Sequence, residues 1–211
     1  MPKIFEKDTQ AQSHLMVWKI EEDEKTLHQY LLLNYHEELE FKKTSHPQKK
    51  LEYLSGKICI ASIVNKLGLP YDGIKKDEFG KPHLINLPFH ISVSHSFPFA
   101  CAILSKVKPV GIDIEVPREK LRVISEKYLN KAELEDSNGN LEKLCIQWSA
   151  KESIYKEYGK KKLIFKENIK VMLGKDPYLN GLKAKTLISG SEKNYSLTVV
   201  KLEDHILCYT L

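Results

Sequence analysis

Apolar and polar residues alternate in distinct patterns along the first half of the chain. Leucines and tyrosines recur at helical spacing in two stretches, whereas strict alternation marks the segment that begins at Phe89. Glycines and prolines interrupt the pattern between these regions. The predicted elements are a strand at 14–20, helices at 24–42 and 51–68, a loop at 71–88, and strands at 89–95 and 99–105.

The second half follows the same order of elements. The predicted elements are a strand at 110–116, helices at 119–135 and 141–158, and strands at 169–173, 182–188, 195–201 and 205–210. Each half of the 211 residues therefore runs from strand to helices to strands. This order predicts an α+β protein with an N-terminal domain at 1–108 and a C-terminal domain at 109–211.

The charge of the chain is mildly basic. Lys and Arg number 33 and Asp and Glu number 28, which gives a net charge of +5, and the arginines are Arg118 and Arg122. This surplus suits an anionic ligand. A nucleic-acid-binding domain would concentrate its basic residues and interleave them with aromatic ones, and the basic runs here lack that feature, so we expect no nucleic-acid partner.

The cysteines and the apolar runs indicate where the protein works. The four cysteines form no CxxC pair, which argues against a zinc site and suits a reducing compartment. The first ten residues have no apolar run of the kind found in signal peptides. No apolar stretch approaches the length of a membrane span. We therefore expect a cytoplasmic protein without a membrane partner.

Two carboxylates follow each other at alternate positions of the strand predicted at 110–116. Asp113 and Glu115 share one face of that strand, and Ile112 and Ile114 share the other. Carboxylates placed in this way can converge on a hard cation. The alternative is a half-buried strand with a solvated polar face, and the motif alone favours that alternative.

The helix predicted at 141–158 carries a charged residue on its apolar stripe. Glu152 falls among the apolar residues of this stripe, and Lys156 lies one turn further at its edge. A buried carboxylate is costly unless it is paired or bound to a metal. The alternative is an ordinary pair between Glu152 and Lys156 at an exposed helix end.

Several basic side chains could bind phosphate groups. His95 continues the apolar alternation of its strand, so it is either a core histidine or a ligand contact. Lysines are usually solvated surface residues, but as a group they can hold phosphates as point charges. The candidates are Lys49, Lys50, Lys57 and Lys81, and the run at 160–162 is expected to be a solvated loop.

Five segments together carry a family resemblance. They are KKLEYLSGK at 49–57, EFGKP at 78–82, ISVSHS at 91–96, VGIDIE at 110–115 and WSAKESIYK at 148–156. In this order and spacing the chain resembles the 4′-phosphopantetheinyl transferases of the two-half, surfactin-synthetase-activating type. The resemblance implies two similar halves related by a pseudo-two-fold axis, with the active site in the cleft between them.

The resemblance also implies an activity and its partners. Family members transfer 4′-phosphopantetheine from coenzyme A to a serine of an acyl or peptidyl carrier protein and release adenosine 3′,5′-bisphosphate. The carrier proteins are typically acidic, which suits a basic enzyme. Because two linked halves complete one site, a monomer is expected. A catalytically silent relative that binds coenzyme A or a carrier protein is the alternative.

Matched position by position, the resemblance assigns roles to individual residues. Asp113, Glu115 and Glu152 would hold Mg²⁺, with Mn²⁺ as the other candidate metal, and Lys156 would contact the pyrophosphate. Glu152 is the first candidate general base and Glu133 the second. The residues expected to face the nucleotide part of coenzyme A are Lys49, Lys50, Lys57, Lys81, Ser94 and His95.

The chain departs from the family pattern at a few positions. The family often has Asn where Ser92 stands and a small residue where Phe97 stands. Lys50 and Lys57 replace the usual arginines, which keeps the charge but loses bidentate phosphate binding. These differences bear on affinity for coenzyme A and leave the expected reaction class unchanged.

Overall fold

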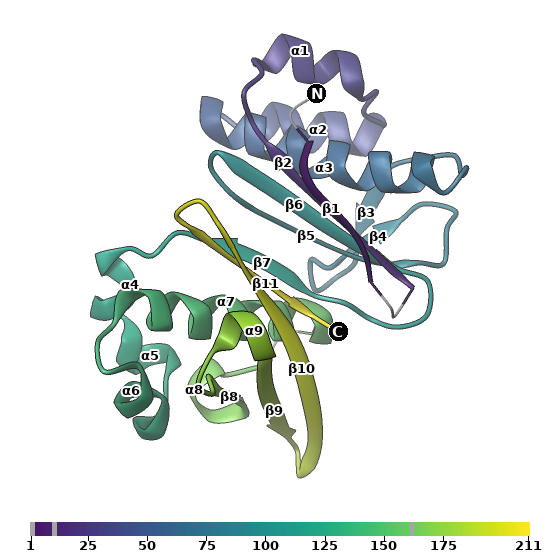
Figure 1. Ribbon diagram of the computed structural model, residues 1–211. Helices are drawn as coiled ribbons and strands as arrows, with labels where there is room; N and C mark the ends of the chain where they lie inside the picture. Colours follow the sequence, from purple (N-terminus) through teal and green to yellow (C-terminus); the bar gives the residue numbers. More distant parts are fainter. Residues whose placement is uncertain (1–2, 10–11, 161–162) are drawn as a thin grey trace. The chain divides into compact units, whose positions relative to one another are not determined.

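Two antiparallel sheets organise the described part of the chain (Figure 1). The computed structural model describes residues 3–9, 12–160 and 163–211. The chain divides into two units, Met1–Val110 and Gly111–Leu211. Lys161 and Lys162, in the basic run predicted as a solvated loop, lie outside the described residues.

The first unit contains a six-stranded sheet in the order β1-β2-β6-β5-β4-β3. Its strands are β1 (Lys3–Thr9), β2 (Ser13–Lys19), β3 (Ile74–Lys76), β4 (Pro82–Leu84), β5 (His90–Ser96) and β6 (Phe99–Ser105). The sequence pattern misses β1, and it is wrong to treat 71–88 as loop throughout, because β3 and β4 pair there. Three-residue strands are too short to show a period of two, so only their pairing reveals them.

Three helices accompany this sheet, namely α1 (Glu24–Tyr30), α2 (Tyr35–Lys43) and α3 (Pro47–Lys66). The single helix predicted at 24–42 is wrong, because the chain is extended at Leu31 and starts a new helix after Asn34. Asn34 and Glu37 form a capping box, in which each side chain accepts a hydrogen bond from the other residue's backbone N–H.

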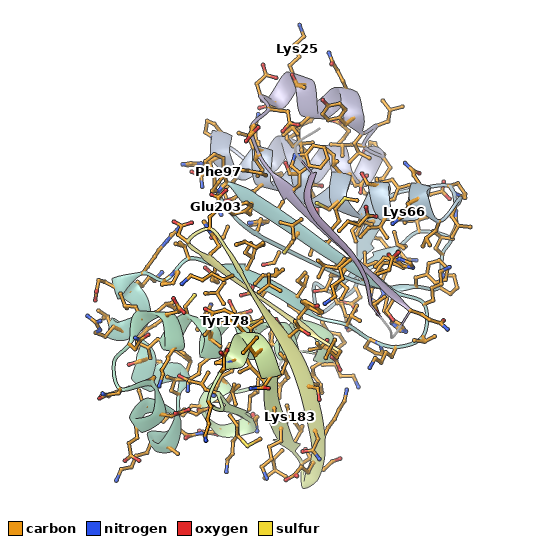
Figure 2. The ribbon with its side chains drawn as sticks, viewed as in Figure 1. Lys25, Lys66, Phe97, Tyr178, Lys183 and Glu203 are labelled. Atoms are coloured by element: carbon orange, nitrogen blue, oxygen red, sulfur yellow. The ribbon has the colours of Figure 1, made fainter. Side chains whose placement is uncertain are left out.

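Helix α3 lies along one face of the sheet and supplies much of its core (Figure 1). Apolar side chains of α3, including Leu54, Ile58 and Ile60, are buried with Trp18 and Ile91 of the strands. The helix ends at Lys66 (Figure 2). Its position fixes the residues of the segment 49–57 against strand β5.

The second unit contains a five-stranded sheet in the order β7-β11-β10-β9-β8. Its strands are β7 (Ile112–Glu115), β8 (Ile169–Met172), β9 (Leu182–Ile188), β10 (Ser191–Leu202) and β11 (His205–Thr210). Lys183 lies on β9 (Figure 2). These strands fall where the sequence predicts them, with β10 starting four residues earlier, at Ser191 rather than at 195.

The helices of the second unit are α4 (Glu119–Val123), α5 (Ser125–Tyr128), α6 (Lys131–Ser137), α7 (Leu141–Tyr158), α8 (Phe165–Asn168) and α9 (Pro177–Asn180). The region predicted to be helical at 119–135 is occupied by three short helices and not by one continuous helix. A capping box between Asn130 and Glu133 starts α6 afresh. Helix α7 packs against β7 and β11 (Figure 1).

The α+β prediction is confirmed, because each unit combines an antiparallel sheet with helices that include one long helix. The pseudo-two-fold relation between the halves stays a prediction, and so does the domain boundary between 108 and 109. Within the described ranges, no helix combines the length and the apolar character that a membrane span requires.

Candidate functional site

Asp113 lies at the centre of a buried polar cluster in the second unit. Asp113 is 3% exposed, and its two neighbours on β7 are isoleucines. One carboxylate oxygen, Oδ1, accepts a hydrogen bond from Lys156 Nζ at 2.7 Å, and the other, Oδ2, accepts one from Ser149 Oγ at 3.0 Å. Lys156 Nζ also donates to the carbonyl oxygen of Ile112 at 3.1 Å. The alternative of a solvated polar face on this strand is therefore wrong for Asp113.

Gly111 explains how α7 comes so close to β7. A Cβ atom on Gly111 would lie 1.8 Å from the carbonyl oxygen of Ser153, which is helix backbone that cannot move aside cheaply. Only glycine allows this close approach. The approach brings Ser149 and Lys156, which lie on either side of Ser153 along α7, to the Asp113 carboxylate.

Glu115 and Glu152 share the electrostatic field of Asp113. Burial, and then the charge of Asp113, raise the pKa of Glu115 to about 6, while Lys156 and a hydrogen bond from the Trp148 indole oppose the shift. Burial, Asp113 and Glu115 raise the pKa of Glu152 to about 7, against the opposing charge of Lys156. Asp113 thus lies near enough to disfavour the ionised forms of Glu115 and Glu152, and Glu115 adds to the effect on Glu152.

Glu152 lies on a side of α7 that is only partly covered. Leu144 and Cys145 of the predicted apolar stripe are buried, but Trp148 and Tyr155 are half-buried, and Glu152 is half-buried with them. The prediction of a core-facing stripe is therefore only partly correct. The reason is that α7 is buried on several sides. Small and polar residues of the helix are therefore buried too, and its apolar residues alone do not mark the covered face.

The described acidic side chains do not form a ready metal centre. In the described ranges, no group of three or more His, Cys, Asp or Glu side chains is arranged so that it could hold a metal ion. The chemistry of Asp113, Glu115 and Glu152 nevertheless fits Mg²⁺, which prefers hard carboxylate oxygens and keeps several waters. A bound cation would also offset the burial and the charge of Asp113, which raise the pKa values of Glu115 and Glu152.

Glu133, the second candidate base, belongs to a different network. It is 4% exposed, and its Oε2 accepts hydrogen bonds from Lys151 Nζ at 2.8 Å and from the Asn130 backbone at 2.9 Å. Its Oε1 accepts a third, from the backbone of Val171 at 2.8 Å. Lys151 is fully buried beside it. These contacts give Glu133 a structural role that joins α6, α7 and β8.

A cavity of about 560 Å³ adjoins this network. Of the predicted site residues, it is lined by Glu133 alone. Asp113, Glu115, Glu152 and Lys156 are absent from its lining, so this cavity is not the acidic site.

In the first unit, a buried carboxylate gathers two of the predicted residues. Glu52 on α3 is 1% exposed, and its Oε2 lies 2.5 Å from Lys49 Nζ and 3.2 Å from His95 Nδ1. His95 itself is 40% exposed, so the alternative of a core histidine is wrong. A cavity of about 200 Å³ is lined by His95, Glu52 and Lys57, among others.

Lys57 and Lys50 have protein partners of their own. Lys57 is buried and donates to Glu37 Oε1 at 2.9 Å, and its Nζ lies over the ring of Tyr53. Burial lowers the pKa of Lys57, although Glu37 opposes the shift. Lys50 Nζ lies 3.5 Å from Glu24 and over the ring of Phe41. Either lysine would have to exchange or share these contacts to bind a phosphate.

Lys81 and Ser94 lie in contrasting settings. Lys81 closes the turn between β3 and β4, where its backbone N–H donates to Asp77 at 2.9 Å and Gly80 adopts a φ of +88° that suits glycine. Ser94 is buried on β5 and, by the alternation of the strand, lies on the face opposite His95. Phe97, where the family often has a small residue, lies at the turn after β5 and is 39% exposed (Figure 2).

Two residues that contact predicted site residues, Ser149 and Glu52, are not among the site residues that the sequence predicts. A signal existed for Glu52, since Lys49 and Glu52 are three residues apart on a helix and can pair. No local signal pointed to Ser149, because its partner Asp113 is 36 residues away along the chain.

The chain is similar to known proteins over part of its length. Two curated proteins are similar over 54% of this chain, at 30% and 32% identity: "4′-phosphopantetheinyl transferase Sfp" of Bacillus subtilis (strain 168) and a "4′-phosphopantetheinyl transferase" of Bacillus subtilis. Each match covers 55% of the relative, so the chain spans about half the length of the curated relatives it matches. The family model of the 4′-phosphopantetheinyl transferase superfamily matches residues 109–209, which include β7, α7 and the Asp113 cluster. Through this half, the chain is similar to the 4′-phosphopantetheinyl transferase superfamily.

Proposed function

We propose that this protein transfers 4′-phosphopantetheine from coenzyme A to a serine of an acyl or peptidyl carrier protein. The observation that carries the proposal is the cluster of Asp113, Glu115, Glu152 and Lys156 on β7 and α7, inside the segment that matches the superfamily. Three carboxylates and a lysine in one partly buried site suit an anionic substrate that arrives with a cation.

In this proposal, Asp113, Glu115 and Glu152 hold Mg²⁺ during the reaction. When bound, the ion would neutralise the charge of the coenzyme A pyrophosphate. The raised pKa values of Glu115 and Glu152 support the proposal, because a bound cation would offset both the burial and the charge of Asp113 that raise them. Lys156, whose Nζ donates a hydrogen bond to Asp113, would also contact the pyrophosphate with this ammonium group.

Glu152 is the general base that we propose. The acceptor serine oxygen forms a bond to the β-phosphorus of coenzyme A, and the bond from that phosphorus to the bridging oxygen breaks. The serine proton passes to Glu152, and adenosine 3′,5′-bisphosphate leaves. The place of Glu152 in the acidic cluster supports this role, because a carboxylate that accepts the serine proton must lie beside the phosphate that Lys156 and the metal would contact.

The first unit would recognise the nucleotide end of coenzyme A. His95 and Lys49 at the buried Glu52 are the best-supported contacts, because His95 is exposed and lines a cavity. Lys81 at the exposed turn is a third. We further propose an acidic carrier protein as the partner, a monomeric state and a cytoplasmic location, on the charge and composition of the chain.

Mass spectrometry of intact carrier proteins tests the proposal. Apo-carrier proteins of the fatty-acid, polyketide and peptide-synthetase types would be incubated with this protein, coenzyme A and Mg²⁺. We expect a mass gain of one phosphopantetheinyl group, which is lost when the acceptor serine is replaced by alanine or when Glu152→Gln is used.

The alternative of a silent binding relative makes the opposite prediction. Coenzyme A would still bind, as measured by calorimetry, but no tested carrier protein would gain mass at any metal concentration. That combination of results would overturn the transferase proposal.

A further inference from the structure

The buried carboxylate of Glu52 lies beside the exposed His95 and contacts four donor groups. Its Oε2 meets His95 Nδ1 at 3.2 Å and Lys49 Nζ, while its Oε1 accepts hydrogen bonds at 3.3 Å from the Gln48 side chain and from the backbone N–H of Phe97. The last of these contacts joins α3 to the turn at the end of β5. A carboxylate with four donors has a fixed position and orientation.

The backbone around Glu52 is fixed by a second close contact. Gly56 lies one turn beyond Glu52 on α3, and Val93 lies two residues before His95 on β5. A Cβ atom on Gly56 would lie 2.8 Å from Val93 Cγ1, so glycine is what lets the helix and the strand approach here. The two contacts, Gly56 with Val93 and Glu52 with His95, set the register of α3 on β5.

The contact at Nδ1 determines which way the His95 ring can act. When Nδ1 donates to a carboxylate, the other ring nitrogen, Nε2, is the atom that remains for a ligand, and it donates to a phosphate oxygen when the ring carries both protons. The acidic partner also fixes the ring plane, as the outer partners of metal-bound histidines do. The 200 Å³ cavity that His95, Glu52 and Lys57 line can admit a phosphate group but is small for a whole nucleotide.

We propose that Glu52 is a positioning residue, which orients His95 so that its Nε2 binds a phosphate of the substrate. The inference rests on the proposed function, since that function supplies coenzyme A as the phosphate-bearing substrate. Glu52 does not touch the phosphate itself, because its own charge would repel that group. Its contribution passes through His95, and Lys49 offsets the negative charge of Glu52 from the other side.

A double-mutant cycle tests the inference. Calorimetry would measure the Kd values of coenzyme A and of dephospho-coenzyme A for the wild type, Glu52→Gln, His95→Ala and the double variant. We expect Glu52→Gln to weaken coenzyme A binding about fivefold to tenfold, with less than a twofold change for dephospho-coenzyme A. In the His95→Ala background, the same substitution should have no further effect. Additive effects, or equal losses for both ligands, would overturn the inference.

Glu40→Gln is the matched control. Glu40 lines the same cavity and contacts Lys76 and Tyr53, but it makes no contact with Glu52 or His95 among the hydrogen bonds described. Its substitution should weaken the binding of neither ligand, because it removes a negative charge from a cavity that is proposed to bind an anion. A loss in this control equal to that in Glu52→Gln would show that any change of a carboxylate in the cavity weakens binding and that the Glu52–His95 contact is not the cause, which would also overturn the inference.

A measurement on the wild type covers the case in which Glu52→Gln fails to fold. In ¹⁵N NMR spectra of the imidazole nitrogens, with His95→Ala used to assign the signals, we expect a proton on Nδ1 of His95 and, with coenzyme A bound, a second proton on Nε2. A ring protonated only at Nε2 would contradict the inference. If the wild type transfers phosphopantetheine but fails this test, the inference alone is wrong. If it neither transfers the group nor binds coenzyme A, the proposed function and the inference both fail.

Discussion

The Ser149 hydroxyl donates a hydrogen bond to Asp113 Oδ2 across 3.0 Å, and both side chains are buried. Lys156 occupies the other oxygen of the same carboxylate. Asp113 is therefore held by one neutral and one charged donor, both from α7. A residue held in this way keeps its orientation when its surroundings change, which a metal ligand or a substrate contact requires.

Removal of the Ser149 hydroxyl should lower activity more than stability alone explains. We expect Ser149→Ala to cost about 1–3 kcal/mol of unfolding free energy and to lower kcat/KM about tenfold, because Asp113 loses a fixed partner. Ser153→Ala is the control, since that hydroxyl is equally buried but contacts the Ser149 and Cys208 carbonyl oxygens. Chemical denaturation and a transfer assay would compare them. Equal kcat/KM values for the two variants would contradict the positioning role.

Glu152 should make the metal-free protein less stable as the pH rises. Its pKa is about 7 in the folded state and 4.5 ordinarily, so the neutral form is favoured by folding. The stability that this group contributes is complete below pH 4.5 and is lost as the pH rises through about 7. Between these pH values we expect the free energy of unfolding of the wild type to fall by on the order of 2–3 kcal/mol. Glu152→Gln should not show this fall.

Denaturant unfolding of the metal-free wild type and of Glu152→Gln between pH 4.5 and 8 measures this effect. Mg²⁺ should stabilise the wild type more at pH 8 than at pH 5.5, because carboxylate ligands must lose their protons to bind a metal. Parallel stability curves for the wild type and the variant would show that Glu152 titrates normally.

Lys156 should act on catalysis rather than on binding. If it stabilises the leaving phosphate, Lys156→Gln should lower kcat and kcat/KM together, and Lys156→Arg should keep partial activity. Lys193→Gln is the control, since Lys193 pairs with Glu157 at the surface. Steady-state kinetics with saturating Mg²⁺ would decide. Full activity in Lys156→Gln, with a lower Tm alone, would reduce Lys156 to a structural partner of Asp113.

Glu133 should prove structural. Glu133→Gln leaves Lys151 buried without its ion-pair partner, and we expect a loss of about 3–5 kcal/mol of stability with kcat kept at temperatures where the protein is folded. The double variant Glu133→Gln with Lys151→Met should recover part of that loss, because no buried charge remains. Thermal unfolding and single-turnover assays would measure both. A large fall in kcat at unchanged Tm would instead favour Glu133 as the base.

The sequence by itself determined the elements whose signals are local. Helix α7 begins at Leu141 and ends at Tyr158, as predicted, because the Asn140 side chain caps its first turn and Gly159 adopts the left-handed conformation after its last. The sequence also contains local signals for the breaks before α2 and α6, namely Asn-x-x-Glu capping boxes that begin at Asn34 and Asn130. The apolar residues continue at helical spacing across these breaks, so their pattern alone does not reveal them.

Only the tertiary structure decided which charged residues are paired. Lys57, Lys156 and His95 look alike in the sequence as candidate phosphate contacts. Their partners are Glu37, Asp113 and Glu52, which lie 20 to 43 residues away along the chain. The first lysine is buried and His95 is exposed. The sequence could not tell them apart, since charge, burial and pKa depend on the neighbours that packing brings together, and periodicity reports only which residues share a face.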